Sequence, residues 1–451
     1  MANGNGIAKP SATKSSADGP PRGSGGPKNI LFISFEACAG DLAYRLKQEG
    51  YSIKWYVQSK ADRVLYDGFL EKVDEWEPHK DWADLVIIDD IGFGALADRL
   101  RKEGKAVVGG SGYTDRLELD RDYGAQEMKA AGLIIPDSWE FDSFEDAIKF
   151  VQKTPARYVV KPSGKAQNDK VLSFVGREED GKDVVAILER YKKGWSTKVH
   201  RLQIQKHVTG VEVAVGGYFN GQDFVMPVCI NFEHKRLFAG EIGPSTGEMG
   251  TSMFWTGPNK LYRETLEKMK TRLAEGGYVG YFDINCIATP RGVFPLEITP
   301  RFGYPTVSIQ MEGVQNPWGE FLYALATKKP YALKTQRGFQ VGVVIALPPW
   351  PFADLDTFRK FSEDAVVIFT KPNMEGIHLG DVKLEEGDWK ITGRDGYALV
   401  VTGSGPTMEE AHREAYARVK TIIIPNMFYR TDIGNRWRHE GDLLHTWGLL
   451  A

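Results

Sequence analysis

The sequence predicts a multidomain protein of mixed α/β and α+β class, with a doubly wound α/β domain at its N-terminus. Apolar, strand-like runs alternate with helical segments over residues 29–115, which is typical of a parallel, doubly wound sheet. Strand patterns dominate residues 336–436, apart from one clear helix, which favours a separate α+β domain. With 451 residues, the chain has room for about three domains at roughly 150 residues each.

Each element of the N-terminal domain has its own signal. The expected strands are NILFISF, YSIKWYV, DLVIID and AVVGGSG. The expected helices are DLAYRLKQEG and ALADRLRKEG, and the first ends at Gly50, a good C-terminal stop. The first strand–helix turn reads SFEACAGD over residues 34–41. It is not GxGxxG, so a dinucleotide-binding fingerprint is absent.

The middle of the chain alternates in the same way. Residues 116–150 are expected to be helical, and a capping-box-like Ser143 starts the helix SFEDAIKFVQK. The strands RYVVKPSG and KVLSFVG, the helix DVVAILERYKK and a set of alternating strands follow. A second helix then precedes the hairpin-like pair YFDINCIATPRGVFPLEITPRFG. The predicted units are a disordered tail (1–28), an α/β domain (29–115), a central domain (116–335), an α+β domain (336–436) and a C-terminal tail (437–451).

Composition excludes several classes of protein. The chain is 42% hydrophobic and 26% charged, with a net charge of −3, so no global cationic field attracts nucleic acid. It has no apolar run of the roughly 20 residues that span a bilayer. Its three cysteines lie far apart and form neither a zinc knuckle nor a disulfide framework. We therefore expect a cytoplasmic protein that binds neither nucleic acid nor membrane.

The strongest chemical pattern is Asp283 with the segment EITPR that follows it on the next strand. Alternate residues of a strand share a face, so Glu297, Thr299 and Arg301 are expected to project together, within reach of Asp283. Two carboxylates and a hydroxyl suit Mg²⁺, and an adjacent arginine would neutralise a transferring phosphoryl group. The alternative is a surface ion pair on an edge hairpin.

Weaker patterns supply the context. Lys161 ends an apolar strand beside the loop PSGKAQND, with Lys170 after it, an arrangement suited to phosphate. Glu212 alternates with valines in GVEVAV, so it faces away from them and could bind a ribose. Lys235 and Arg236, just before the loop GPSTGEMG, could hold an anionic substrate. Each of these residues could instead be an ordinary solvated side chain.

Read in order, these segments resemble the ATP-grasp ligases, and within them the glycinamide ribonucleotide synthetase (phosphoribosylamine–glycine ligase) family. The resemblance runs from about residue 29 to 436. VVKPSGKAQNDKV is similar to the family's strand–loop–strand with two phosphate-contacting lysines, and EHKRLFAGEIGPSTGEMG to its DHKR…GPNTGGMG segment. GVFPLEITPRFGYPT resembles its metal-binding strand, and the region ending in YRTDIG resembles its C-terminal YRKDIG segment.

The resemblance implies an ATP-grasp fold that uses ATP with Mg²⁺ or Mn²⁺. A carboxylate would attack the γ-phosphate to give an acyl phosphate, and an amine would then displace phosphate to form an amide. The implied site residues are Lys161, Lys170 (or Lys165), Gln205 and Glu212 for ATP, Asp283, Glu297 and Thr299 for the metal, and Arg301, Lys235 and Arg236 for catalysis.

Several positions depart from the family's pattern. Thr299 replaces a usual Asn, Gln205 a usual Glu and Glu248 a Gly, and the stretch AQNDK stands where the family has AAGKG. The family's GGREHA turn, which helps to bind phosphoribosylamine, is here EACAGD. The expected reaction joins phosphoribosylamine and glycine in purine biosynthesis. The alternatives are a ligase that joins another amine to an amino acid, and a non-catalytic ATP-binding scaffold. The expected partners are small molecules, with a monomer or weak homo-oligomer as the assembly.

Overall fold

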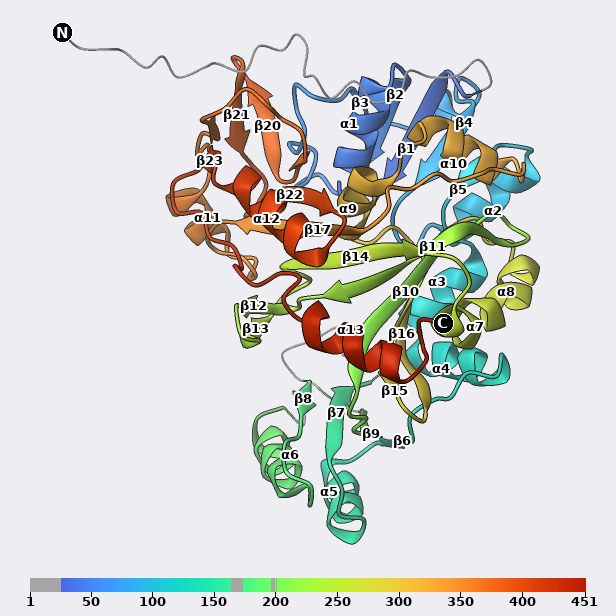
Figure 1. Ribbon diagram of the computed structural model, residues 1–451, viewed down its shortest axis with the longest axis vertical. Coiled ribbons are helices and arrows are strands. Elements are labelled where there is room, and N and C mark those ends of the chain that lie inside the picture. Colours follow the sequence, from blue (N-terminus) through green and yellow to red (C-terminus); the bar gives the residue numbers. More distant parts are fainter. Residues whose placement is uncertain (1–25, 164–172, 196–198, 200) are drawn as a thin grey trace, which may run out of the picture.

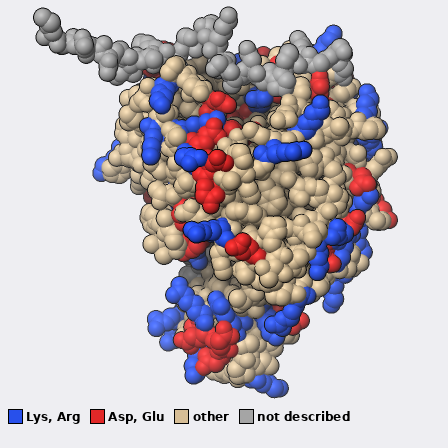
Figure 2. Space-filling view, viewed as in Figure 1, with Lys and Arg blue, Asp and Glu red and all other residues tan. Residues whose placement is uncertain are grey.

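The computed structural model describes residues 26–451, except 164–172, 196–198 and 200. Figure 1 shows an N-terminal α/β layer at the top, a large sheet across the middle and a small lobe that protrudes below. Nearly all of the predicted N-terminal tail, and Lys165 and Lys170 of the predicted phosphate loop, lie outside the described residues. On the face shown in Figure 2, acidic and basic side chains are interspersed.

The N-terminal layer is a five-stranded sheet in the order β3-β2-β1-β4-β5, and its neighbouring strands all pair in parallel. Apolar side chains of β1 lie on both faces and are fully buried, as expected for a sheet covered on both sides. This confirms the predicted doubly wound domain. Its elements are β1 (Asn29–Ser34), α1 (Gly40–Gln48), β2 (Ser52–Val57), β3 (Lys72–Val73), η1 (Glu77–His79), β4 (Leu85–Ile88), α2 (Gly94–Lys102) and β5 (Val107–Val108).

Two helices lead from this layer into a small lobe, which is a four-stranded antiparallel sheet in the order β6-β9-β7-β8. Two helices pack on one face of this sheet around a separate apolar cluster that includes Ile148, Val160 and Ile204. The elements are α3 (Gly112–Leu119), α4 (Arg121–Ala130), β6 (Ser138–Phe141), α5 (Phe144–Lys153), β7 (Tyr158–Pro162), β8 (Phe174–Val175), α6 (Lys182–Trp195) and β9 (Leu202–Lys206).

The large sheet has eight strands in the order β16-β15-β10-β11-β14-β17-β22-β19. It continues across residue 336, so the predicted boundary between the central and C-terminal domains falls inside one hydrogen-bonded sheet. β14 pairs directly with β17, for example Thr251 with Gly342. Its strands are β10 (Val211–Phe219), β11 (Phe224–Glu233), β14 (Gly250–Thr256), β15 (Gly280–Thr289), β16 (Gly292–Thr299), β17 (Phe339–Ala346), β19 (Ile377–Leu379) and β22 (Tyr397–Gly405).

The remaining elements flank this sheet. Three pairs of short strands are β12 (Arg236–Phe238) with β13 (Ile242–Ser245), β18 (Ile368–Phe369) with β23 (Ile422–Ile423), and β20 (Val382–Glu385) with β21 (Asp388–Ile391). The helices are α7 (Lys260–Glu264), α8 (Leu266–Glu275), α9 (Thr306–Gly313), α10 (Trp318–Ala326), α11 (Leu355–Phe361), α12 (Met408–Val419) and α13 (Trp437–Thr446). No helix in the described part of the chain is long and apolar enough to cross a membrane.

The last 15 residues, expected as a tail, are packed against the large sheet. They contain α13, which lies along β10 (Figure 1). Leu444 and Leu449 are buried in the apolar cluster on the face of the sheet that holds the β10 valines. The backbone N–H of Leu261 donates to the Leu449 carbonyl at 3.1 Å. Burial of these leucines, at about 1.5–3 kcal/mol each, explains why the segment is ordered.

Candidate active site

The polar face of the large sheet carries the predicted catalytic residues. On β10, Val211, Val213 and Val215 are buried on the opposite face, so Glu212 points the other way, as the alternation predicted. Across β15 and β16, Asp283 pairs in register with Thr299, and Asn285 with Glu297. Because paired residues of antiparallel strands share a face, the three predicted metal ligands lie together there.

A lysine lies among three carboxylates on this face. The Lys235 Nζ is 3.2 Å from Glu233, 3.3 Å from Glu212 and 3.4 Å from Glu297. Burial lowers the pKa of Lys235, but the three carboxylates outweigh burial and hold the pKa well above its usual value. The ammonium therefore stays charged and holds three strands of the site together.

Asp283 is the most constrained acid in this cluster. Its side chain is 4% exposed, and its Oδ2 accepts hydrogen bonds from Tyr281 at 2.9 Å and Asn231 at 3.1 Å. Burial, reinforced by the charge of Glu233, raises the pKa of Asp283 to about 7. Its Oδ1 is buried and has no hydrogen-bond partner among the described residues, which leaves one carboxylate oxygen available for a ligand.

These donors fit Mg²⁺. Asp283 and Glu297 offer carboxylates and Thr299 a hydroxyl, which are the hard oxygen ligands that the ion prefers. Within the described ranges, no three His, Cys, Asp or Glu side chains cluster as a metal site. Mg²⁺ is usually held by one or two carboxylates together with substrate phosphates, so two carboxylates suffice for such a site.

The small lobe presents its own polar face to this cluster. In the β7–β9 register, Lys161 pairs with Gln203, and Val159 pairs with Gln205, so Lys161 and Gln205 share one face while Val160 packs in the lobe's core. Burial, with the positive charge of Arg121, lowers the pKa of Lys161 to about 8. The charges of Glu297, Lys235 and Glu212 also act on Lys161, so its ammonium lies within electrostatic range of these side chains of the large sheet.

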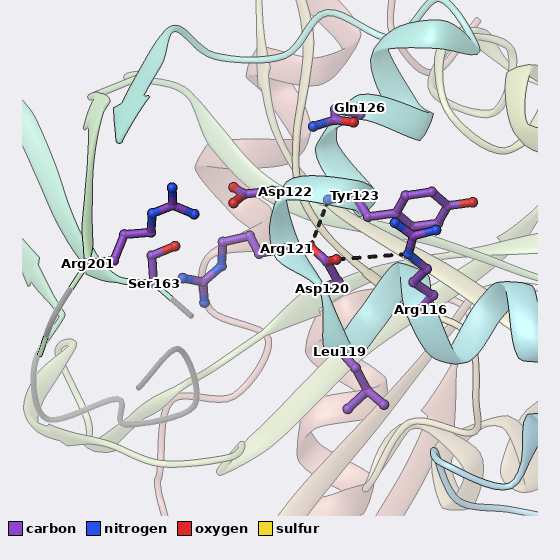
Figure 3. Close-up of a pocket in the computed structure, with 9 residues that line it drawn as sticks. All are labelled: Arg116, Leu119, Asp120, Arg121, Asp122, Tyr123, Gln126, Ser163 and Arg201. Carbon is purple, nitrogen blue, oxygen red and sulfur yellow. Dashed lines mark hydrogen bonds and ion pairs between the residues drawn. The ribbon is translucent and has the colours of Figure 1, made fainter. Parts of the chain in front are cut away.

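A pocket of about 420 Å³ lies at the junction of the small lobe and α4 (Figure 3). Arg121 extends from α4 toward Ser163 and Arg201 of the small lobe in this view. Its Nη1 donates to the Pro162 carbonyl at 2.8 Å, at the end of β7. Arg121 thus fixes α4 to the strand that carries Lys161, and it adds a positive charge beside that lysine. Arg121 was not among the site residues predicted from the sequence.

Two predicted catalytic arginines are placed differently from the rest. Arg301 lies just beyond β16, and its Nη2 and Nε bind the Glu118 carboxylate of α3 at 2.9 and 3.2 Å. It is therefore held by an ion pair at the edge of the cluster. Arg236 is exposed and donates to the Gly243 carbonyl at 3.1 Å. Among the described residues, no hydrogen bond or ion pair joins Arg236 to the predicted metal ligands.

Two further residues of the polar face were not singled out from the sequence. Glu233 is an ion-pair partner of Lys235, and Asn231 binds Asp283. Both lie on β11, where they alternate with the buried Phe232. This period-two pattern leading into EHKR was the signal that could have identified them, since it places both on the face of Glu212.

The altered turn after β1 lies in an acidic region. Arg394, in the segment before β22, is 3.6 Å from Glu36 and 3.7 Å from Asp62. Asp62 is 4% exposed, and its Oδ2 has no hydrogen-bond partner in the described part of the chain. Burial and the charges of Asp62 and Asp90 raise the pKa of Glu36. The carboxylates that raise the pKa of Glu36, which are Asp62, Asp90 and Asp395, outnumber the arginine that lowers it, Arg394.

Known proteins of one family are similar to this chain in sequence. Residues 120–306 match the model of the family described as phosphoribosylglycinamide synthetase, ATP-grasp (A) domain. The phosphoribosylamine–glycine ligase of Streptococcus suis is 26% identical over 360 residues, which cover 77% of this chain and 82% of that protein. The enzyme of the same name from Corynebacterium ammoniagenes is 27% identical over 359 residues, with 75% and 79% covered.

Solved structures share the fold. The phosphoribosylamine–glycine ligase of Thermotoga maritima has a TM-score of 0.69 at 21% identity, covering 90% of this chain and 100% of that one. The biotin carboxylase domain of Hydrogenobacter thermophilus 2-oxoglutarate carboxylase, solved with MgADP, has a TM-score of 0.59 at 13% identity, covering 90% and 92%. The predicted ATP-grasp fold is confirmed, and the chain is similar in sequence and fold to phosphoribosylamine–glycine ligases.

Proposed function

We propose that the protein is an ATP-dependent carboxylate–amine ligase that forms an amide through an acyl phosphate, with ATP bound between the small lobe and the large sheet. The observation that carries this proposal is the position of Lys161. Lys161 belongs to the small lobe, yet its ammonium is close enough to the polar face of the large sheet for the charges of Glu297, Lys235 and Glu212 to act on its pKa. A lysine opposite oxygen ligands is the arrangement that a metal–triphosphate needs.

Each side chain then has a defined task. Lys161 binds the phosphates, Gln205 lies beside the adenine and Glu212 accepts from the ribose, while Lys170 or Lys165 of the neighbouring loop adds a second phosphate contact. Asp283, Glu297 and Thr299 would hold Mg²⁺ or Mn²⁺, which would supply positive charge to offset the negative charge of the phosphates. Arg301 stabilises the transferring phosphoryl group, and its two hydrogen bonds to Glu118 Oε1 fix its direction. Lys235 and Arg236 bind the acyl phosphate.

The first candidate substrates are those in the relatives' names. Glycine carboxylate would attack the γ-phosphate and release ADP, and the amine of phosphoribosylamine would displace phosphate to form glycinamide ribonucleotide, a step of purine biosynthesis. Catalysis of the first step is mainly positioning and charge neutralisation, which the cluster supplies. We propose a cytoplasmic enzyme with small-molecule partners, acting as a monomer or weak homo-oligomer.

A second candidate, a ligase for another amine, is favoured by the acidic turn after β1. The carboxylates of Glu36 and Asp62 near Arg394 attract an ammonium group more readily than a phosphate. The scaffold alternative lacks comparable support, because the charged residues of the site come together in the fold.

The test measures ADP release from MgATP with single amino acids, with and without freshly generated phosphoribosylamine, and identifies products by mass spectrometry. Glycinamide ribonucleotide formed only when both substrates are present would establish the first candidate. Turnover with another amine would establish the second. ATP binding without ADP release in every mixture would overturn the ligase proposal and leave the scaffold.

A further inference from the structure

One buried acid near the cluster has no role in the mechanism above. Glu248 lies in the loop between β13 and β14, and its side chain is 7% exposed. Its Oε1 is buried without a hydrogen-bond partner among the residues that the structure describes. A buried carboxylate oxygen left without a donor is costly, so the presence of a glutamate at this position points to a ligand that supplies the donor.

The loop is held beside Lys235 by its backbone on both sides of Glu248. Thr246 N–H donates to the Lys235 carbonyl at 2.7 Å, and Met249 N–H donates to the His234 carbonyl at 2.8 Å. These two bonds fix the loop against the segment that carries the central lysine. The position of Glu248 next to the reaction centre is therefore set by the backbone and does not depend on a side-chain contact of its own.

The surroundings of Glu248 are acidic. Burial raises its pKa well above the usual value, and the charges of Glu233 and Asp283 add to this effect while Lys235 opposes it. Tyr397, the first residue of β22, is within electrostatic range of Glu248, because the charge of Glu248 adds to the effect of burial in raising the tyrosine's pKa. The Tyr397 hydroxyl is also buried and without a partner in the described ranges. Two oxygen atoms that lack donors thus lie near each other, next to the reactive cluster.

We propose that Glu248 binds the α-ammonium group of the substrate whose carboxylate is phosphorylated, and so makes the enzyme select an α-amino acid. An ammonium group has three N–H donors and no acceptor, which suits the carboxylate of Glu248 and the hydroxyl of Tyr397. In an α-amino acid a single carbon joins the ammonium to the carboxylate. A group that binds the ammonium must therefore stand beside the place where the carboxylate reacts, as Glu248 does.

Charge supports the same class of substrate. The charges of Glu233 and Asp283 act on the surroundings of Glu248. A carboxylic acid without an amino group would add further negative charge there, whereas a zwitterionic amino acid brings a compensating ammonium group. The proposal rests on the proposed ligase function, because it needs a carboxylate substrate at this site. It concerns the acid that is activated and leaves the identity of the amine open.

The experiment compares glycine with glycolate, which has a hydroxyl in place of the ammonium. ADP release from MgATP is measured with hydroxylamine present, which traps the acyl phosphate as a hydroxamate and removes the need for the natural amine. If another amino acid is preferred among the common twenty, that amino acid is compared with its 2-hydroxy acid. The proteins are the full-length wild type, Glu248→Gln and Glu275→Gln, a control at an exposed position at the end of α8.

For Glu248→Gln we expect kcat/KM for glycine to fall about tenfold to hundredfold, the effect of losing a charged hydrogen bond, with kcat/KM for glycolate and KM for ATP unchanged. The control should match the wild type. An equal loss for both acids, or no loss for glycine, would overturn the proposal. A thermal unfolding midpoint at or above that of the wild type would show that the variant is folded.

Calorimetric titration with glycine in the presence of a non-hydrolysable ATP analogue separates this proposal from the ligase function. Binding that Glu248→Gln weakens, in a wild type that makes no hydroxamate from any acid, would refute the ligase and keep the ammonium site. Hydroxamate formation with an unchanged preference for glycine over glycolate in Glu248→Gln would keep the ligase and refute the ammonium site. Neither binding nor turnover would refute both.

Discussion

Replacement of Glu297 by Gln separates a functional role from a structural one. The Glu297 side chain is 60% exposed, and its Oε1 is 3.4 Å from the Lys235 Nζ. An ion pair with such exposure contributes about 0–1 kcal/mol to stability. Lys235 also keeps two shorter contacts, at 3.2 and 3.3 Å, to Glu233 and Glu212. We therefore expect the free energy of unfolding to change by less than about 1 kcal/mol.

The effect on turnover should be far larger. If Glu297 is a metal ligand, its neutralisation removes charge stabilisation from the phosphoryl-transfer step, and loss of one such group costs about 3–4 kcal/mol. At 1.36 kcal/mol for each factor of ten, ADP release should fall about 10²–10³-fold or more. A surface ion pair, the alternative left open by the sequence, would cost almost nothing.

The assay follows ADP release with hydroxylamine over a range of Mg²⁺ concentrations, together with urea unfolding of the same samples. Glu275→Gln serves as the matched exposed glutamate control. Normal turnover in Glu297→Gln would refute the metal site. A loss of turnover accompanied by a matching loss of stability would show that Glu297 has a structural role instead.

Four further results are expected. Thr299→Asn should retain turnover and lower the Mg²⁺ concentration for half-maximal rate, because an amide oxygen is a better ligand; loss of all activity would give the hydroxyl a role of its own. Glu118→Ala should lower the free energy of unfolding by about 3 kcal/mol in urea titrations, since it strands the charge of Arg301, and an unchanged midpoint would contradict this. ATP affinity, measured by calorimetry, should fall about tenfold as pH rises through about 8, where Lys161 loses its proton, and Lys161→Met should abolish this dependence. Burial and the charge of Asp90 raise the pKa of Asp89 from 3.8 to about 7, so between these pH values the folded state keeps a proton that the unfolded state has lost. The free energy of unfolding should therefore fall by up to about 4 kcal/mol as the pH rises from about 4 to about 7; Asp89→Asn should flatten that part of the profile.

Local sequence was enough to predict most of the strands and the faces of the site, although β6 (Ser138–Phe141) lies in a stretch that was expected to be helical. The valines alternating with Glu212 predicted its side of β10, and the EITPR segment predicted that Glu297 and Thr299 lie together, which the register with Asn285 and Asp283 confirms. These predictions succeeded because side-chain direction in a strand depends only on local geometry with a period of two.

Contacts between distant segments could not be predicted in this way. Arg121 of α4 lies beside Lys161, and Glu118 of α3 binds Arg301 across 183 positions of sequence. The segment 437–451 was expected as a tail, but its few apolar residues find a complementary surface on the large sheet. No local pattern encodes such a partner, because the partner surface exists only after the sheet has formed.

The sequence by itself therefore determined the ATP-grasp resemblance, the order of most elements and the set of candidate oxygen ligands, since these depend on residue type and short-range spacing. Only the tertiary structure decided which charges neutralise one another. It set Lys235 among three carboxylates, paired Arg301 with Glu118 and left the Oε1 of Glu248 buried with no hydrogen-bond partner among the described residues. The physical reason is that burial and Coulomb energy depend on distances in space, and in this chain the deciding neighbours come from different strands and helices.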